Sequence, residues 1–181
     1  LNIFPSNVCN FRCSYCAQSL GPEGLLEKYG FPQEMMKMEI VDMIVRQSER
    51  FDRKYKLVSF MGHGEPLCNR KLPEMIRKIK DADIADRVDV ITNASLLTKE
   101  YADELTDAGL DVLRISLQGV SAKSYSDICG VRIDFDRFVD NLTYFYRNRG
   151  QCRVYMKTVD ASLSDGEEEK FYKIFSPICD R

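Results

Sequence analysis

Three cysteines stand close together early in the chain, in the stretch NVCNFRCSYCAQ at residues 7–18. Cys9, Cys13 and Cys16 have the spacing C-x3-C-x2-C, and the other four cysteines are scattered. Soft thiolate ligands suit zinc and iron-sulfur clusters, so one loop with three thiols could wrap a single inorganic centre. The chemical question is what such a centre does with three ligands and no fourth beside them.

The three cysteines have alternative interpretations, which differ in the ligands or the burial that they require. Structural zinc is tetrahedral and closed, whereas the single histidine, His63, stands far from the cysteines in the sequence. Three buried core cysteines are another alternative, because a free cysteine packs as a small hydrophobe. A three-thiolate site would instead be coordinatively open. An iron-sulfur electron carrier and a zinc-stabilised binding module therefore stay open beside an enzyme.

The elements that must position the triplet alternate along the chain. Apolar runs predict strands over 1–4, 56–61, 87–92, 111–118 and 152–159. Apolar residues at helical spacing predict helices over 31–51, 71–82, 98–109 and 134–148, and another near Ser164. Pro73 fits only a first turn, Thr98 is the expected cap of its helix, and Gly109 is the expected terminator. This alternation predicts an α/β fold with a parallel sheet and right-handed crossovers.

Polar and glycine-rich segments collect where the predicted strands end. The cysteines follow the first strand, GHGEP the second, TNAS the third and SLQG the fourth. The C-terminal ends of parallel strands share one edge, which is the ligand-binding face of barrels and open α/β sheets. We therefore expect these four segments to form one site.

Composition narrows the class of protein. The 181 residues are 44% hydrophobic and 30% charged, the balance of an ordinary globular protein with one domain, residues 1–181. With 26 basic and 28 acidic residues, nothing favours nucleic acid as a partner. No apolar run approaches a membrane span and no signal peptide is evident, so we expect a cytoplasmic protein. The odd, uneven set of cysteines favours reduced thiols or a metal site over disulfides.

The stretch CNFRCSYC resembles the cysteine motif of the radical S-adenosylmethionine superfamily, C-x3-C-x-aromatic-C, with Tyr15 in the aromatic position. The resemblance implies that Cys9, Cys13 and Cys16 hold a [4Fe-4S] cluster whose fourth iron is left for S-adenosylmethionine. It also implies the family's reaction. A reductant such as flavodoxin or ferredoxin supplies an electron, S-adenosylmethionine is cleaved, and the 5'-deoxyadenosyl radical takes hydrogen from a substrate. The missing thiol is then a position kept for a cofactor.

Three further segments extend the resemblance over about residues 1–160. MGHGEPL resembles the family's GGEP motif, which holds the amino group of S-adenosylmethionine. ITNAS resembles the TNG segment, and RISLQG resembles the SLDG segment, whose serine meets the ribose or carboxylate of that cofactor. The cofactor-binding residues that the resemblance implies are Tyr15, Gly64, Glu65, Thr92, Asn93 and Ser116.

The chain departs from the family's pattern at three of these motif positions. His63 replaces the first glycine of GGEP, so either the backbone there avoids positive φ or it accepts strain. Ala94 and Gln118 replace the glycine of TNG and the acid of SLDG. We expect His63 to be a hydrogen-bonded loop residue rather than an acid-base catalyst.

Lys157 lies near the end of the fifth predicted strand, outside these motifs. Its side chain either faces substrate or is solvated.

The resemblance implies a partial (β/α) barrel. The chain starts without methionine and ends at SPICDR, so we expect a fragment whose closing strand and any C-terminal extension lie beyond Arg181. Relatives modify peptides, sugars and small metabolites, and the shared fold does not indicate which of these substrates is used.

Four cysteines without close partners are expected to be structural or incidental: Cys68, Cys129, Cys152 and Cys179.

Overall fold

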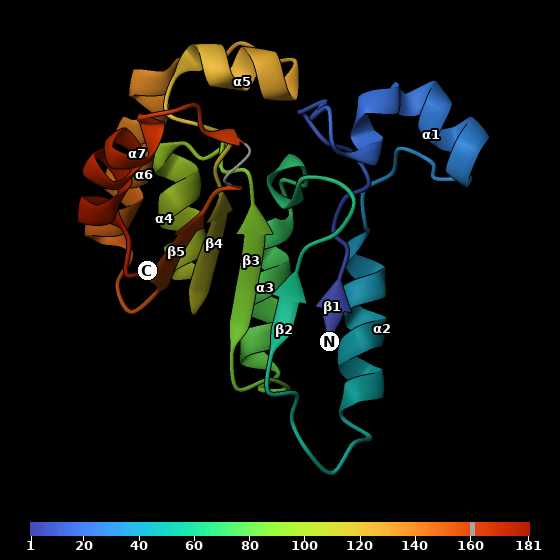
Figure 1. The fold of residues 1–181 in the computed structure, drawn as a ribbon. Helices are drawn as coiled ribbons and strands as arrows, with labels where there is room; N and C mark the ends of the chain where they lie inside the picture. The colour runs from blue at the N-terminus through green and yellow to red at the C-terminus, as the bar shows by residue number, and fades with distance from the viewer. Residues whose placement is uncertain (160–161) are drawn as a thin grey trace.

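A five-stranded parallel sheet is the centre of the computed structural model, which describes residues 1–159 and 162–181 (Figure 1). The strands lie side by side in chain order, and each neighbouring pair is parallel. A sheet whose spatial order equals its chain order is the arc of a partial (β/α) barrel, which confirms the predicted fold class. The strands are β1 (Asn2–Ile3), β2 (Val58–Phe60), β3 (Val88–Thr92), β4 (Val112–Ser116) and β5 (Arg153–Lys157).

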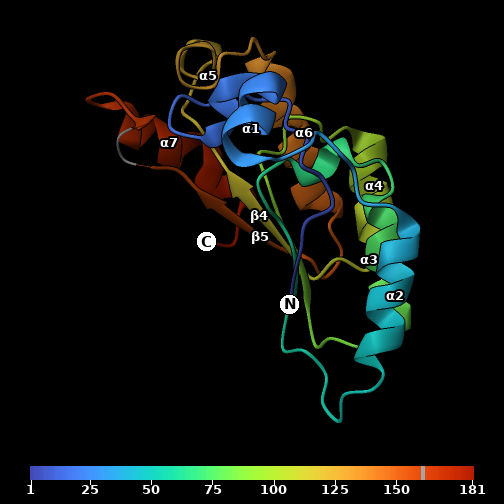
Figure 2. The same cartoon turned by 90° about the vertical axis from the view of Figure 1, so that its right-hand side faces the viewer.

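The helices fall into two groups. Helices α2, α3 and α4 lie together along one face of the sheet (Figure 2), and α6 packs beside α4. Helices α1 and α5 lie instead beyond the C-terminal ends of the strands (Figure 1). The bounds are α1 (Gly21–Tyr29), α2 (Met38–Ser48), α3 (Leu72–Asp81), α4 (Lys99–Asp107), α5 (Ala122–Cys129), α6 (Phe135–Asn148) and α7 (Glu167–Phe175).

Helix α3 shows why the sequence folds this way. Leu72, Met75, Ile76 and Ile79 recur at helical spacing, and all four are fully buried between the helix layer and the sheet. Each such side chain contributes about 1.5–3 kcal/mol when it leaves water. The opposite face of α3 is polar, so the sequence pattern fixes which face meets the strands.

Several local predictions are confirmed. Pro73 stands in the first turn of α3, where its missing N–H costs nothing. The Thr98 side chain caps α4 by accepting a hydrogen bond from the Tyr101 N–H at 3.2 Å. Gly109, just past the end of α4, has φ +81°, a conformation that favours glycine.

The helix predicted over 31–51 starts later than expected. Residues 31–37 are not helical, and α2 begins at Met38. The segment before it bonds to the chain that follows β1: the Asn7 N–H donates to the Glu34 carbonyl at 2.8 Å, and the Met36 N–H donates to the Pro5 carbonyl at 2.9 Å. Tertiary hydrogen bonds thus replace the helical ones there. Helices α1 and α5 were not predicted.

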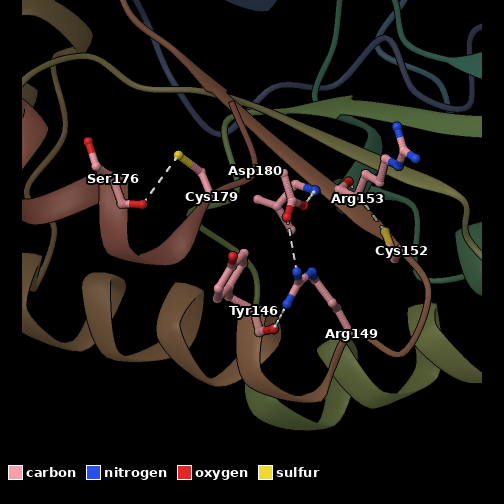
Figure 3. A network of polar contacts seen from close by, with 8 residues as sticks. Tyr146, Arg149, Cys152, Arg153, Ser176, Cys179 and Asp180 are labelled. Atoms are coloured by element: carbon pink, nitrogen blue, oxygen red, sulfur yellow. Dashed lines mark hydrogen bonds and ion pairs between the residues drawn. The ribbon is translucent and has the colours of Figure 1, made fainter.

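The last residues of the chain lie along β5. The Val154 N–H donates to Asp180 Oδ2 at 2.7 Å, and Arg149 Nη2 donates to Asp180 Oδ1 at 3.0 Å (Figure 3). Cys152 and Cys179 belong to this network, where their thiols face the carbonyls of Arg153 and Ser176. Both cysteines therefore lie away from the C-terminal end of β1. No helix among the described residues is long and apolar enough to cross a membrane.

Candidate iron-sulfur and cofactor site

One cavity at the C-terminal ends of the strands collects the predicted site residues. Its wall contains Cys9, Cys13 and Cys16. It also contains every residue that the sequence assigns to cofactor binding: Tyr15, Gly64, Glu65, Thr92, Asn93 and Ser116. These residues come from the loops after β1, β2 and β3 and from the last residues of β3 and β4. Convergence at this edge is what parallel strands in a barrel produce.

Helix α5 holds the cysteine loop in place. The backbone N–H groups of Arg12 and Ser14 donate to the carbonyls of Cys129 and Ile128, each at 2.9 Å. The last carbonyls of a helix have no partner within the helix, so they are free to accept these bonds. Cys13, between the two donors, is thereby fixed against the end of α5.

The three thiols differ in their surroundings. Burial raises the pKa of Cys9 to about 12, whereas a hydrogen bond with the Cys129 thiol lowers the pKa of Cys13 to about 7. A metal ligand must be a thiolate, so Cys13 is nearer to the ligating form than Cys9 is. Among the described residues, no three potential ligands already surround a common point. The donor set itself, three sulfurs in one wall, fits a soft iron-sulfur centre.

A ring of hydrogen bonds ties the cysteine loop to the loop after β3. Asn93 Nδ2 donates to Asn10 Oδ1 at 3.1 Å, and Asn10 Nδ2 donates to Ser95 Oγ at 2.8 Å. The Ser95 hydroxyl closes the ring by donating to Asn93 Oδ1 at 2.7 Å. Asn93 therefore has a positioning role in addition to its place in the cavity wall.

Glu65 joins the loops after β2 and β3. Its carboxylate is only 3% exposed and accepts from the Leu67 N–H at 2.9 Å, the Asn93 N–H at 2.8 Å and the Thr92 hydroxyl. Burial raises the pKa of Glu65, while these three bonds oppose the shift. A carboxylate offers about four acceptor positions, so the protein uses most of them. The expected contact with a ligand ammonium group is left with about one position.

Gly64 and His63 show how the GHGEP loop approaches the cysteine loop. A Cβ on Gly64 would lie 2.3 Å from the Ser6 carbonyl oxygen, so glycine is required for space rather than for φ. His63 avoids positive φ, and Gly62 carries φ +143° instead. The His63 ring is exposed and packs against Phe31 at a centroid distance of 5.0 Å. The first of the two expected outcomes for His63 is thus the observed one.

Tyr15 connects the cysteine loop to the chain after β4. Its hydroxyl donates to Gln118 Oε1, and Gln118 Nε2 lies 3.4 Å from the Ser116 carbonyl. The glutamine that replaces the family's acid is therefore the hydrogen-bond partner of the motif aromatic. The Lys157 side chain, at the end of β5, is exposed and does not line the cavity.

The sequence reasoning missed one residue of the cavity wall, Gln18, and the contact of Cys129 with the cysteine loop. Gln18 is 3% exposed, lines the cavity and bridges two loops by donating to the carbonyls of Asn7 at 3.0 Å and His63 at 2.8 Å. Cys129, expected to be structural or incidental, is fully buried beside Cys13, which agrees with a structural role. No local motif marks either residue, and only the way α5 folds back over the loop could reveal the second.

A partial barrel with three thiols in one cavity wall at the C-terminal ends of its strands has the donor set of an iron-sulfur α/β protein. The sequence profile of the Radical SAM superfamily matches residues 3–159, and the chain belongs to this family. The family uses a [4Fe-4S] cluster and S-adenosylmethionine, as expected from the cysteine motif.

Similar proteins agree with this assignment. A probable GTP 3',8-cyclase of Methanococcus maripaludis (strain C5) is 39% identical over 129 residues, which are 71% of this chain and 38% of that protein. One of Saccharolobus islandicus (strain Y.N.15.51) is 33% identical over 142 residues, 78% of this chain and 42% of that protein. The chain thus spans about two fifths of the length of these relatives.

Solved structures share the fold at low identity. Streptococcus suis SuiB bound to the precursor peptide SuiA superposes with a TM-score of 0.70 at 21% identity, over 96% of this chain and 35% of that one. BtrN in complex with AdoMet and 2-DOIA superposes with a TM-score of 0.59 at 18% identity, over 86% of this chain and 55% of that one. These similarities concern the fold.

Proposed function

We propose that residues 1–181 are the catalytic core of a radical S-adenosylmethionine enzyme, which cleaves this cofactor reductively and takes hydrogen from a substrate. The observation that supports this proposal most strongly is that the three cysteines and the residues of the other motifs line one cavity. When bound, the cluster and S-adenosylmethionine together supply a 5'-deoxyadenosyl radical from one added electron. The chain's own residues would bind the cluster and S-adenosylmethionine, orient them and shield them from water.

The proposed metal ligands are Cys9, Cys13 and Cys16. Cys13 is held by the end of α5, and the loop around it is held by the ring through Asn10. These contacts restrict the conformations of the loop before any ligand is bound. A site ordered in advance loses less entropy on binding, which favours capture of the cluster.

The proposed cofactor contacts are arranged around the remaining wall. Glu65 is placed to accept from an ammonium group with its free acceptor position, a charge-assisted bond in a buried site. Ser116 stands at the end of β4 to meet a hydroxyl or carboxylate, and Tyr15 keeps the two sides together through Gln118. Gly64 keeps the backbone close enough for these loops to share one cavity.

For the substrate we propose only which compound to assay first. The curated relatives are named for cyclisation of GTP, so GTP is the first substrate to assay, although this chain covers only 38% of the first of them. A small electron-transfer protein such as flavodoxin or ferredoxin is the proposed reductant. A cytoplasmic location remains a prediction.

The test is anaerobic reconstitution with iron and sulfide, followed by S-adenosylmethionine and a strong reductant. We expect about four irons per chain and formation of 5'-deoxyadenosine. Cys13→Ala should lose most of the iron. Cys152→Ala, another buried cysteine but at the opposite edge of the sheet, should keep it. Iron without 5'-deoxyadenosine would indicate an electron carrier, and tight zinc without iron would indicate a binding module.

A further inference from the structure

A second cavity, here called the arginine cavity, has a volume of about 330 Å³ and contains Arg87, Arg114 and Arg153 in its wall. Side chains alternate between the two faces of a strand, so Arg114 lies on the same face of β4 as Ser116, and the residue between them is buried in the core. This face is turned away from helices α2, α3 and α4 (Figure 2). Val112 also lines the arginine cavity, four residues before Ser116 in the wall of the cofactor cavity. The two cavities therefore lie on one face, about 13 Å apart along β4.

Arg114 is held in place by two neighbouring strands. Its Nε donates to Asp89 Oδ2 at 2.6 Å, and Asp89, on β3, is only 1% exposed. On the other side, the guanidinium carbon of Arg114 lies 5.1 Å from the centre of the Tyr155 ring on β5. These contacts use Nε and the face of the guanidinium group, and neither Nη group forms a hydrogen bond with a residue that the structure describes. The two Nη groups thus form a fixed fork, the geometry that suits the oxygens of a carboxylate or a phosphate.

The other charged groups of the arginine cavity leave an excess of positive charge. Arg87 and Arg153 are exposed, and neither forms an ion pair within the described part of the chain. Asp111 is the one acidic residue among the described residues of the wall. Its two carboxylate oxygens accept from Lys80 Nζ at 2.9 and 2.8 Å, and one of them also accepts from the Val88 N–H at 2.7 Å. Asp111 is therefore already neutralised, and the charges of Arg87 and Arg153 are not.

We propose that the arginine cavity binds a phosphoryl group of the substrate, with the Nη groups of Arg114 donating to its oxygens. A phosphoryl group carries about 1.5 to 2 negative charges at neutral pH, so it uses the charges of Arg87 and Arg153 more fully than a single carboxylate does. The binding of an anion here does not need the cluster, but the word substrate rests on the proposed function. Because the two cavities are about 13 Å apart, the substrate is an elongated molecule with its phosphoryl group far from its reacting atom.

The experiment measures binding of inorganic pyrophosphate by titration calorimetry at an ionic strength of about 0.05 M. It uses the chain before iron is added, because pyrophosphate itself binds iron. The double variant Arg114→Gln/Asp89→Asn removes both charges of the pair, so no buried charge is left without its partner. We expect it to bind pyrophosphate about ten- to hundredfold more weakly than wild type. Arg153→Gln should bind about two- to fivefold more weakly.

The matched control is Arg46→Gln, which removes an exposed arginine from the last turn of α2 and should leave the affinity unchanged. An equal loss in Arg46→Gln and Arg153→Gln would overturn the inference, because it would show only a general attraction of anions to surface charge. Wild-type affinity in the double variant would overturn it as well. If that variant does not fold, Arg87→Gln/Arg153→Gln decides, since both side chains are exposed and unchanged affinity would contradict the site.

Sodium acetate, titrated under the same conditions, separates the two anion chemistries. Acetate that binds as tightly as pyrophosphate would refute the phosphoryl assignment. Iron uptake is measured separately, so the two proposals can fail independently. A chain that takes up iron but binds no pyrophosphate refutes this inference alone. A chain that binds pyrophosphate through Arg114 but takes up no iron supports the anion site and refutes the proposed function.

Discussion

Gly64→Ala should disrupt the packing between the GHGEP loop and the cysteine loop. A methyl group at this position would lie 2.3 Å from the Ser6 carbonyl oxygen and 2.6 Å from that of Val8. Both atoms belong to the backbone, so no side chain can rotate away. The chain just before Cys9 must therefore move, and the hydrogen bond from the Glu65 N–H to the Val8 carbonyl, 2.8 Å long, is strained or lost.

The cost can be worked from these contacts. Overpacking in a tight site costs about 1–3 kcal/mol, and contacts with fixed backbone place Gly64→Ala at the upper end. Loss of one buried hydrogen bond adds about 1 kcal/mol. We expect a total loss of about 3–4 kcal/mol, a large part of the roughly 5–15 kcal/mol by which domains are stable.

Urea unfolding and iron content measure the two consequences of Gly64→Ala. The matched control is Gly30→Ala at the end of α1, where nothing lies within 4 Å of the added Cβ and only the φ of +67° is unfavourable. That control should cost about 1–2 kcal/mol and leave the reconstituted iron content unchanged. If Gly64→Ala is as stable as wild type and binds as much iron, the two loops are not packed as described.

Three further changes test other contacts. Burial raises the Glu65 pKa above its unfolded value, so its stabilising contribution is present at low pH and lost as the pH rises through the folded pKa. Glu65→Gln has no titrating group at this position, so its free energy of unfolding lacks the pH dependence that Glu65 gives the wild type. Urea unfolding measured from about pH 5 to about pH 8 should therefore show the variant gaining stability relative to wild type as the pH rises. Curves of stability against pH that run parallel would contradict this. Tyr15→Phe removes the bond to Gln118 and should weaken S-adenosylmethionine binding about two- to tenfold in calorimetry with iron unchanged, whereas unaltered affinity would place the hydroxyl outside the site. Asn93→Ala opens the ring with Asn10 and should lower the free energy of unfolding by about 2–4 kcal/mol; a loss below about 1 kcal/mol would mean that the ring contributes little.

The sequence predicted the parts of the fold that its local patterns determine. Four buried apolar residues of α3, Leu72, Met75, Ile76 and Ile79, recur at helical spacing, and Thr98 and Gly109 mark the limits of α4. The early start predicted for α2 was wrong because Met36 and its neighbours bond to the chain after β1. Helix α1 was missed because three glycines and a proline within or beside it resemble a loop.

Helix α5 could have been found, since both of its ends carry ordinary signals. Ser121 caps it by accepting from the Ser124 N–H at 3.2 Å, and Gly130 follows in the left-handed conformation. Its eight residues are short and rich in serine, which weakens the helical pattern.

The candidate site was predictable where motifs follow strands and unpredictable where loops meet. The cysteines, Gly64 and Asn93 reach one cavity because each follows a parallel strand. Glu65 accepts hydrogen bonds from Thr92 and from two backbone N–H groups. These bonds depend on the distance between neighbouring loops, which cannot be predicted from the sequence of any one segment. The bonds from Arg12 and Ser14 to the carbonyls of Cys129 and Ile128 depend on a helix that follows β4 in the chain and returns to the cysteine loop.

That returning helix sets an order for synthesis. The ribosome releases the cysteine loop long before α5, so the N–H groups of Arg12 and Ser14 have no carbonyl partners while β2 and β3 are being made. The nascent loop acquires its final hydrogen bonds only after Ile128 and Cys129 have emerged and packed against it beyond the ends of the strands. Domains fold from the N-terminus during translation, but this site is completed late. Under the proposed function, iron would therefore be inserted after α5 has been translated, because the cysteine loop lacks its α5 contacts until then.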